Sequence, residues 1–559
     1  MGVALGGCAS KSSLPSHRPD DVNLTHDSTP YVDTGGMGTP PGQEDYDQDG
    51  YGATDDCNNS DPAVHPGAAE VCNENDDDCD GLVDEGDGSY IDGDGDGFGG
   101  RLMTTCDAPG EHVTTAAGGD CDDEDPAIYP GAEDPECDQV DQDCDGLGTE
   151  AARFEDGVSF DTIQQALDAA GPAEIITICS GEHAEHLIAA YGAELELRSF
   201  DGDPTSTYID GRASGRILEL QGGTATIRNL GFRNGYVKRV DDSSDESEDG
   251  GAIYARDENL TLIGSRFEKN EADYGGAIGW SSRDSESHPV ERTVVVEDSS
   301  FDSNSAHDRG GDISIGGLTY GVVWISLTSN MFSLSYSERQ GGAISVGGGI
   351  VFDMSVRDNV FEAASSGRGG GCMYIEALLF DYPIEFEFGP LVITDSAFRG
   401  CSADGDGGAV RVVTGNPEVY PYPFLVDLEN VEFTENESTG HGAALQFEGD
   451  GPIEAIITDV IFDQQVSGGG GSAIASIDEV PTTIRCERCT ITGSQAGFEG
   501  GAVDIDDFAT FESIDSDWGS LSTDNDPNDL VIPDYLYRNL KEHETFTCSP
   551  GAGCTIVLP

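Results

Sequence analysis

The chain has 559 residues and a formal net charge of −82 at pH 7, because 108 Asp and Glu face only 26 Lys and Arg. Such an anionic field repels phosphate backbones and acidic polysaccharides, which excludes nucleic acid and pectin-like polymers as expected partners. A hydrophobic content of 36% with 76 Gly favours a folded protein rich in tight turns, with metal cations as the counter-charge.

The first 44 residues are expected to form an export signal and a tether. Leu5-Gly6-Gly7-Cys8 resembles a bacterial lipobox, in which Cys8 becomes the lipidated first residue, although the usual basic and apolar segments before it are missing. A chance occurrence of these four residues is the alternative. Residues 9–44 are rich in Ser, Thr, Pro, Gly and Asp, as in a solvated linker. With 15 Cys in the chain, we expect an extracytoplasmic lipoprotein at the outer membrane or cell surface of a Gram-negative bacterium, held to the membrane by lipid.

Residues 45–150 hold two copies of one acidic unit, predicted as tandem modules over 45–88 and 89–150. The matched segments are "DYDQDGYG" (45–52) with "DGDGDGFG" (92–99), "DCNNSDPAVHPGA" (56–68) with "DCDDEDPAIYPGA" (120–132), and "CNENDDDCDG" (72–81) with "CDQVDQDCDG" (137–146). Between residues 19 and 150 the only Lys or Arg is Arg101. Ions and disulfides, rather than ion pairs between side chains, are therefore expected to hold these modules.

Each copy contains two Asp-rich loops that could curl carboxylates around one cation. In the first loop Asp45, Asp47 and Asp49 stand at positions 1, 3 and 5 and Asp56 at position 12, as in an EF-hand-like loop. A solvated acidic linker is the alternative, but four aligned loops favour metal binding. The predicted ligands are Asp45, Asp47, Asp49 and Asp56; Asp76, Asp78 and Asp80; Asp92, Asp94, Asp96 and Asp120; and Asp141, Asp143 and Asp145. Asp84 and Glu85 follow the second loop and Glu150 follows the fourth, outside this set.

The unit as a whole, D-C-x-x-x-D-P-x-x-x-P-G-A followed by C-x6-C-D-G, resembles the metal-binding motif of MopE-type surface proteins. That family's name is tied to copper. Oxygen-only ligands are hard and suit Ca²⁺, so Ca²⁺ is the predicted structural cofactor. Cu is the minor alternative, because it would need His65, His112, Met103 or thiolates, and the cysteines are expected to be oxidised.

The aligned positions of the cysteines predict several disulfides. The expected pairs are Cys72 with Cys79, Cys137 with Cys144, Cys106 with Cys121, Cys486 with Cys489, and Cys548 with Cys554. Cys57 is left without a local partner, and Cys179, Cys372 and Cys401 are unassigned.

The sequence changes character after residue 150. "DTIQQALDAA" (161–170) has Ile163, Ala166, Leu167 and Ala170 at helical spacing behind an Asp or Thr cap, and Gly-Pro follows it. A β-rich run comes next. This short amphipathic helix resembles the one that plugs the first coil of pectate-lyase-like β-helices.

From residue 250 two signals repeat every 25 to 37 residues. One is a Gly-Gly-Ala-Ile-like corner, and the other is an aromatic residue after a short strand. The corners lie at 250–254, 275–279, 310–314, 341–345, 370–374, 407–411, 441–445, 471–475 and 500–504. The paired signals resemble the repeats of chlamydial polymorphic outer-membrane proteins over roughly residues 220–510.

This pattern predicts a mainly β fold: a right-handed parallel β-helix over 151–530, with a cap over 531–559. Corner glycines allow sharp turns, the Phe residues are expected to stack along the core, and Asn270, Asn304 and Asn436 to bond turn backbone across coils.

Two functions remain open for the β-helix. A non-catalytic adhesion or scaffold role toward a glycan or protein surface is the main expectation. A carbohydrate-active lyase or hydrolase is the alternative, since such enzymes share the architecture, although a fold alone implies no activity. "TGHGAA" (439–444) contains a Gly-His-Gly, but it falls in register with the other corners, so His441 is interpreted as a substituted corner glycine. No catalytic residue is predicted.

Overall fold

The computed structural model describes residues 44–559 except 108–112, 133–136, 138–139, 145–149, 238–248, 284–290, 319–321, 349–350, 379–387, 417–420, 478–480, 498–500, 506–507, 520–524, 526–529, 533–534, 538–543, 550–552 and 558–559. The chain forms two compact units, Met1–Pro126 and Ala127–Pro559. The division falls inside the second acidic copy, and the predicted module boundaries at 88 and 150 stay predictions. Cys8 and Asp145 lie outside the described residues.

The N-terminal unit contains little regular structure. Three strands, β1 (Glu85–Asp92), β2 (Arg101–Thr104) and β3 (Val113–Thr115), form an antiparallel sheet in the order β2-β1-β3. Within 44–107 and 113–126, the buried hydrophobic side chains are Val64 and Ile91. Apolar burial therefore cannot be what mainly stabilises this unit.

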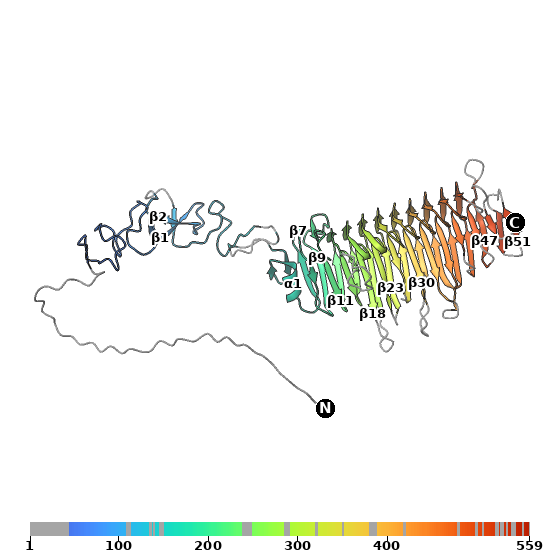
Figure 1. Cartoon of the computed structure of the whole chain (residues 1–559), viewed down its shortest axis with the longest axis horizontal. Coiled ribbons are helices and arrows are strands. Elements are labelled where there is room, and N and C mark those ends of the chain that lie inside the picture. Colours follow the sequence, from blue (N-terminus) through green and yellow to red (C-terminus); the bar gives the residue numbers. More distant parts are fainter. Residues whose placement is uncertain are drawn as a thin grey trace, which may run out of the picture. The chain divides into compact units, whose positions relative to one another are not determined.

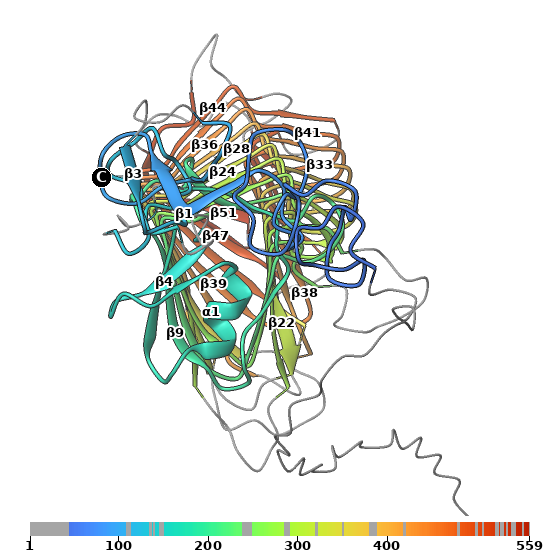
Figure 2. The ribbon, with the colours of Figure 1, turned by 90° about the vertical axis from the view of Figure 1, so that its left-hand side faces the viewer.

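The second unit is a parallel β-solenoid whose coils run through four sheets, here called sheets I to IV (Figure 1). From β15 onward each coil places one strand in sheet I, then II, III and IV, and each strand pairs in parallel with its equivalent in the next coil. Seen along the coils, sheet I (β9, β39) and sheet IV (β22, β38) lie on opposite sides of the interior (Figure 2). The predicted mainly β, parallel solenoid is confirmed.

Sheet I contains β4 (Ala152–Phe154), β5 (Ser159–Phe160), β6 (Glu174–Ile178), β9 (Glu194–Ser199), β12 (Thr224–Arg228), β15 (Asn259–Ile263), β19 (Arg292–Glu297), β23 (Val322–Thr328), β27 (Val351–Arg357), β31 (Leu391–Thr394), β35 (Phe424–Glu429), β39 (Ile453–Thr458), β43 (Thr482–Glu487), β47 (Thr510–Ser516), β50 (Glu544–Ser549) and β51 (Gly553–Val557). Sheet II contains β7 (Gly181–His183), β10 (Thr207–Asp210), β13 (Gly231–Arg233), β16 (Arg266–Glu268), β20 (Ser300–Asp302), β24 (Met331–Ser333), β28 (Val360–Glu362), β32 (Ala397–Arg399), β36 (Glu432–Thr434), β40 (Ile461–Asp463) and β44 (Thr490–Thr492).

Sheet III contains β17 (Glu271–Tyr274), β21 (Ser305–Arg309), β25 (Tyr336–Ser337), β29 (Ser365–Ser366), β33 (Ser402–Ala403), β37 (Glu437–Ser438), β41 (Val466–Ser467) and β45 (Gln495–Ala496). Sheet IV contains β8 (Leu187–Ile188), β11 (Leu218–Gln221), β14 (Ile253–Arg256), β18 (Ile278–Arg283), β22 (Ile313–Leu318), β26 (Ile344–Val346), β30 (Met373–Ala377), β34 (Val410–Thr414), β38 (Leu445–Gly449), β42 (Ile474–Ser476), β46 (Val503–Ile505), β48 (Leu530–Ile532) and β49 (Tyr535–Tyr537).

A stack of phenylalanines runs through the core, one from each successive strand of sheet II. Consecutive rings are 4.6 to 5.2 Å apart between centroids and 3° to 12° from parallel. The rings belong to Phe232, Phe267, Phe301, Phe332, Phe361, Phe398, Phe433 and Phe462. Parallel in-register pairing brings identical side chains together at the inter-strand spacing, so the predicted aromatic ladder follows directly.

The corner glycines and the Asn residues act as predicted. Gly275 has φ of +64°, and a Cβ on Gly276 would lie 2.3 Å from the carbonyl oxygen of Gly311 in the next coil. The buried Asn270 donates through Nδ2 to the Phe232 carbonyl at 3.1 Å, while its backbone N–H donates to Asn304 Oδ1 at 2.9 Å. Neighbouring coils are thus joined by backbone and amide hydrogen bonds at a corner that only glycine fits.

The solenoid is closed at its N-terminal end by α1 (Ile163–Ala169), which lies across the coils in Figure 2. The Thr162 hydroxyl caps it by accepting from the Gln165 N–H at 3.1 Å, and Ile163, Ala166 and Leu167 are buried. At the other end β50 pairs antiparallel with β47, and Trp518 is buried against Phe511 and Phe546. No helix in the described ranges is both long and apolar enough to cross a membrane.

Candidate metal centre

The first acidic loop gathers the carboxylates of Asp45, Asp47 and Asp49, whose oxygens lie within 4.8 Å of one another. Backbone N–H groups of the loop hold the carboxylates in place: Gly50 donates to Asp45 at 3.1 Å and Tyr51 to Asp49 at 2.8 Å. The buried Oδ2 atoms of Asp47, Asp49 and Asp56 have no hydrogen-bond partner in the described structure. Besides burial, the charge of Asp56 raises the pKa of Asp47, so the carboxylate from position 12 lies near this cluster.

The third loop repeats this arrangement in the same unit. Gly97 donates to Asp92 Oδ2 at 3.2 Å, and the buried Oδ2 atoms of Asp94, Asp96 and Asp120 lack a partner among the described residues. Burial raises the pKa of Asp120, and the charges of Asp96, Asp123 and Asp94 raise it further. That coupling places Asp120 beside the loop despite the long insertion between residues 97 and 120.

The second loop gathers a carboxylate that lies outside its Asp alternation. Asp78, Asp80 and Glu85 bring their oxygens within 4.8 Å, and Glu85 Oε2 is buried without a partner in the described structure. Glu70, Asp76 and Asp78 form an adjoining group. The signal for Glu85 is its spacing, nine residues after the first Asp, which recurs between Asp141 and Glu150.

The fourth loop is described in part. Asp141 and Asp143 lie in the described structure, whereas Asp145 does not. Glu150 Oε2, at the position equivalent to Glu85, is buried and lacks a partner among the described residues.

Burial and the repulsion between neighbouring carboxylates make the ionised form of these loops unfavourable. Burial, with the nearby charges of Asp49 and Asp56, raises the pKa of Asp47, and burial raises the pKa of Asp94 and Glu85 in the same way. Buried carboxylate oxygens without donors are costly, and crowded like charges add to that cost. A bound cation would satisfy both needs, so the residues fit a metal ion.

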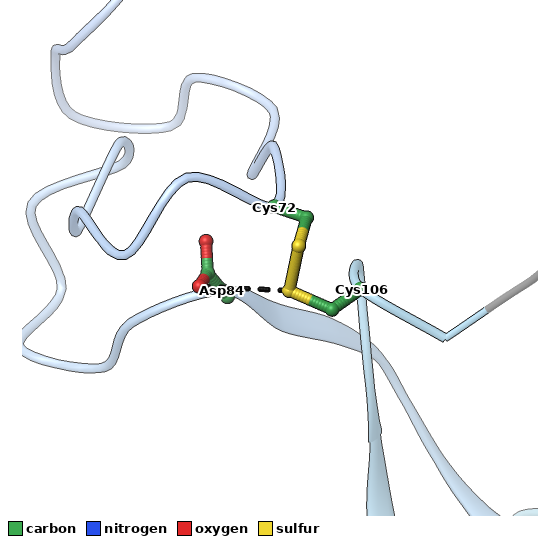
Figure 3. A group of neighbouring side chains, drawn as sticks. All are labelled: Cys72, Asp84 and Cys106. Carbon is green, nitrogen blue, oxygen red and sulfur yellow. Dashed lines mark hydrogen bonds between the residues drawn. A yellow bond between two sulfur atoms is a disulfide. The ribbon is translucent and has the colours of Figure 1, made fainter.

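Asp84 has a different role from its acidic neighbours. It accepts hydrogen bonds from the backbone N–H groups of Asn73 at 2.8 Å and Glu74 at 3.0 Å. Its Oδ2 lies 3.7 Å from Cys106 Sγ, and Cys106 forms a disulfide with Cys72 (Figure 3). Because these sulfurs are bonded to each other, this group is a brace beside the loop rather than a thiolate metal site.

The disulfides differ from the sequence prediction. The expected pairs Cys72–Cys79, Cys106–Cys121 and Cys137–Cys144 are wrong, whereas Cys486–Cys489 is present. The observed pairs are Cys57–Cys79, Cys72–Cys106, Cys137–Cys179, Cys372–Cys401 and Cys486–Cys489. Cys121, Cys144 and Cys548 are each disulfide-bonded, and Cys548 lies opposite Cys554 in the β50–β51 ladder.

The physical reason is that the loops around the carboxylates turn neighbouring cysteines apart. Cys79 has φ of +61° between Asp78 and Asp80, so its side chain leaves the carboxylate side and reaches Cys57. Bridges of 22 and 34 residues then tie separate loops together, where a seven-residue closure would constrain one loop only.

Comparison with known proteins bears on the acidic copies. A family model described as "Putative metal-binding motif" (Cu-binding MopE) matches residues 56–85 and 120–149. The matched segments include Asp56, the second loop and Asp120, and they omit the Asp-x-Asp-x-Asp starts at 45–49 and 92–96. No curated protein matches the chain.

Two solved structures are similar to this chain. One is the catalytic domain of a GH87 α-1,3-glucanase in complex with tetrasaccharides, with 13% identity, a TM-score of 0.32, and coverage of 68% of this chain and 67% of that one. The other is the catalytic unit of a thermostable GH87 α-1,3-glucanase from Streptomyces thermodiastaticus strain HF3-3, with 14% identity, a TM-score of 0.30, and coverage of 65% and 67%.

Proposed function

We propose that this is an exported surface protein whose N-terminal loops bind structural Ca²⁺ and whose β-helix has a non-catalytic adhesion or scaffold role. The observation that carries the metal assignment is the set of buried carboxylate oxygens without donors. These are contributed by Asp47, Asp49, Asp56, Glu85, Asp94, Asp96, Asp120 and Glu150. Hard oxygen ligands in flexible Asp-Gly loops are the usual environment of Ca²⁺.

Copper fits these residues less well. The described cysteines of the acidic copies are disulfide-bonded, so they offer no thiolate. His65 stacks on Tyr51 with the ring centroids 5.1 Å apart, and its Nδ1 lies 3.3 Å from the Pro66 carbonyl oxygen. Copper is therefore kept as the minor alternative.

The proposed location is the outer membrane or cell surface, with a lipid on Cys8 as the anchor. Disulfides throughout the chain support an oxidising compartment, and a parallel solenoid offers long repetitive faces suited to a glycan or protein partner.

A carbohydrate-active enzyme is the second candidate, because carboxylates gather around Arg309 on the solenoid. Its Nη1 lies 2.9 Å from Glu376 Oε2, and its Nε lies 3.6 Å from Asp308 Oδ1. Glycoside hydrolysis requires two carboxyl groups of separated pKa. Here both carboxylates contact the same guanidinium, an arrangement that favours binding over proton transfer.

Calcium titration of the full chain by native mass spectrometry and calorimetry tests the metal assignment. We expect Ca²⁺ to bind to the chelator-treated protein, and Asp49→Asn and Asp96→Asn each to remove or weaken one site. Asp427→Asn, an exposed carboxylate on sheet I, is the matched control. Tighter binding of Cu²⁺ than of Ca²⁺, or no loss in either variant, would contradict the assignment.

Release of reducing ends or of unsaturated uronates from a polysaccharide panel tests the second candidate. The adhesion or scaffold role predicts binding to cells without turnover, and turnover would replace that role with the enzymatic one.

A further inference from the structure

Sheet IV carries a depression three coils long on its outward face. Parallel pairing aligns the outward positions of five successive strands, which hold Tyr254, Gly279, Ser314, Ser345 and Tyr374 in turn. The intervening positions, Ile278, Ile313 and Ile344, point into the core. Two tyrosines therefore bracket a row of three very small residues.

A second row beside it is equally small. Ser281 pairs with Gly316. Gly347, which directly follows the end of β26, holds the equivalent position in the next coil. Two steps between Gly279 and Ser345 at the inter-strand spacing give a floor about 10 Å long, and Tyr254 and Tyr374 hold the equivalent positions in the coils on either side. The cavity over this floor has a volume of about 210 Å³ and is also lined by Tyr274 and Arg309.

The wall of the groove is aromatic and polar. Tyr274 is 37% exposed, and its hydroxyl lies 3.4 Å from Asp308 Oδ2. Arg309 reaches two coils along the axis to the buried Glu376. Glu376 also accepts from the Gly348 N–H at 3.1 Å and the Tyr374 hydroxyl at 3.3 Å, so this end of the groove is held in one geometry.

The charges around the groove select against ionic ligands. Arg309 is the cation among the described residues that line the groove, its charge is balanced by Asp308 and Glu376, and the chain carries −82 overall, so the groove does not favour an acidic sugar or a phosphate. A cationic ligand would have to compete with Arg309, which contacts both Glu376 and Asp308, for these carboxylates. A neutral polyol meets neither penalty, and an exposed aromatic ring beside polar groups suits a sugar ring.

We propose that this groove binds a neutral oligosaccharide laid along the solenoid axis, with Tyr274 as the stacking surface and sheet IV as the floor. The inference rests on the proposed surface-binding role and names its ligand class. Small floor residues let the sugar approach the backbone, and Tyr254 and Tyr374 limit the length that fits.

Calorimetry of the full chain in Ca²⁺ with short neutral hexose oligosaccharides of varied linkage tests the proposal. We expect at least one of them to bind, and uronate oligosaccharides and oligolysine not to bind. Tyr274→Ala and Ser314→Trp should each weaken binding about tenfold or more, the first by removing the ring and the second by filling the floor. Ser326→Trp is the matched control, because Ser326 points outward from sheet I on β23, the strand that directly follows the strand of Ser314.

Binding that survives both groove variants, tighter binding of oligolysine, or no binding by any neutral oligosaccharide would overturn the groove assignment. The proposed calcium role is checked separately on the same samples by protease resistance with and without chelator. If sugar binding fails while protease resistance still depends on calcium, the groove assignment is wrong and the proposed calcium role stands. If sugar binds while protease resistance does not depend on calcium, the groove assignment stands and the calcium role is wrong.

Discussion

At the scale of single residues, Asp312 is a buried acid in a corner position where every other repeat has alanine except the one with Cys372. It is 0% exposed, accepts from Asn304 Nδ2 at 2.9 Å and contacts the Ser335 hydroxyl, and burial raises its pKa to about 8. Between the unfolded pKa and 8 the folded state binds the proton and the unfolded state does not. The free energy of unfolding therefore falls as pH rises through this interval and is level above it.

Asp312→Ala should remove that slope. Relative to the wild type, its melting temperature should rise between pH 5 and pH 8 by several degrees, because one proton bound only in the folded state over three pH units corresponds to about 4 kcal/mol. Thermal unfolding followed by circular dichroism at both pH values measures the effect, with Asp427→Asn as the control. An unchanged difference between the two pH values would show that Asp312 is ionised in the fold.

Glu85 is the candidate ligand that lies outside the Asp alternation of the second loop. Glu85→Gln should weaken calcium binding at the second loop by about tenfold, because a neutral amide replaces a buried carboxylate that has no other partner. Calorimetry measures the change, and Glu74→Gln, at an exposed neighbouring position, should leave calcium binding as it is. Equal affinities in the two variants would remove Glu85 from the site.

At the scale of elements, the phenylalanine stack makes each coil depend on its neighbours. Phe361 is fully buried, with Phe332 at 4.7 Å and Phe398 at 4.6 Å between ring centroids. Phe361→Ala should destabilise the solenoid by about 3–5 kcal/mol, since it opens a cavity in the middle of the stack. Denaturant unfolding measures the loss, and Phe361→Leu should lose clearly less. Equal losses in both variants would mean that the lost ring stacking, rather than the cavity, accounts for the destabilisation.

The repeat predicted these elements because a solenoid converts sequence period directly into contact. Once Gly-Gly corners and Phe positions are aligned, each residue's neighbours in the next coil follow from the register. The same alignment contained a disulfide that the prediction missed. Cys372 stands at the corner position that Asp312 holds, and Cys401 at the position three after Phe398, where Ser335 stands relative to Phe332.

The acidic copies were harder to predict because their contacts do not follow a period. The alternating Asp positions identify the loops, and the Asp56 spacing extends to Asp120 through an insertion. Cysteine partners could not be derived in the same way, since the direction of each side chain depends on how the backbone turns around the clustered carboxylates. Cys79 and Cys144 share a positive φ that local spacing does not report.

At the scale of the whole molecule, the two units are stabilised by different forces, and that difference is testable. The N-terminal unit buries Val64 and Ile91 among its described hydrophobic residues, whereas the solenoid has a continuous core. Removing the cations therefore exposes crowded carboxylates in the first unit and leaves the apolar burial of the second unchanged. In chelator, limited proteolysis of the full chain should cut within residues 44–126 at least about tenfold faster, while fragments from the solenoid persist.

Reductant added with the chelator should accelerate that cleavage further, because Cys57–Cys79 and Cys72–Cys106 still close the loops when the cation is gone. Mass spectrometry of the fragments over time separates the two effects, and Ca²⁺ added back before the protease should restore resistance in the non-reduced sample. Cleavage that is equally fast with and without chelator would mean that the disulfides alone hold this unit. The orphaned carboxylates would then need another source of positive charge.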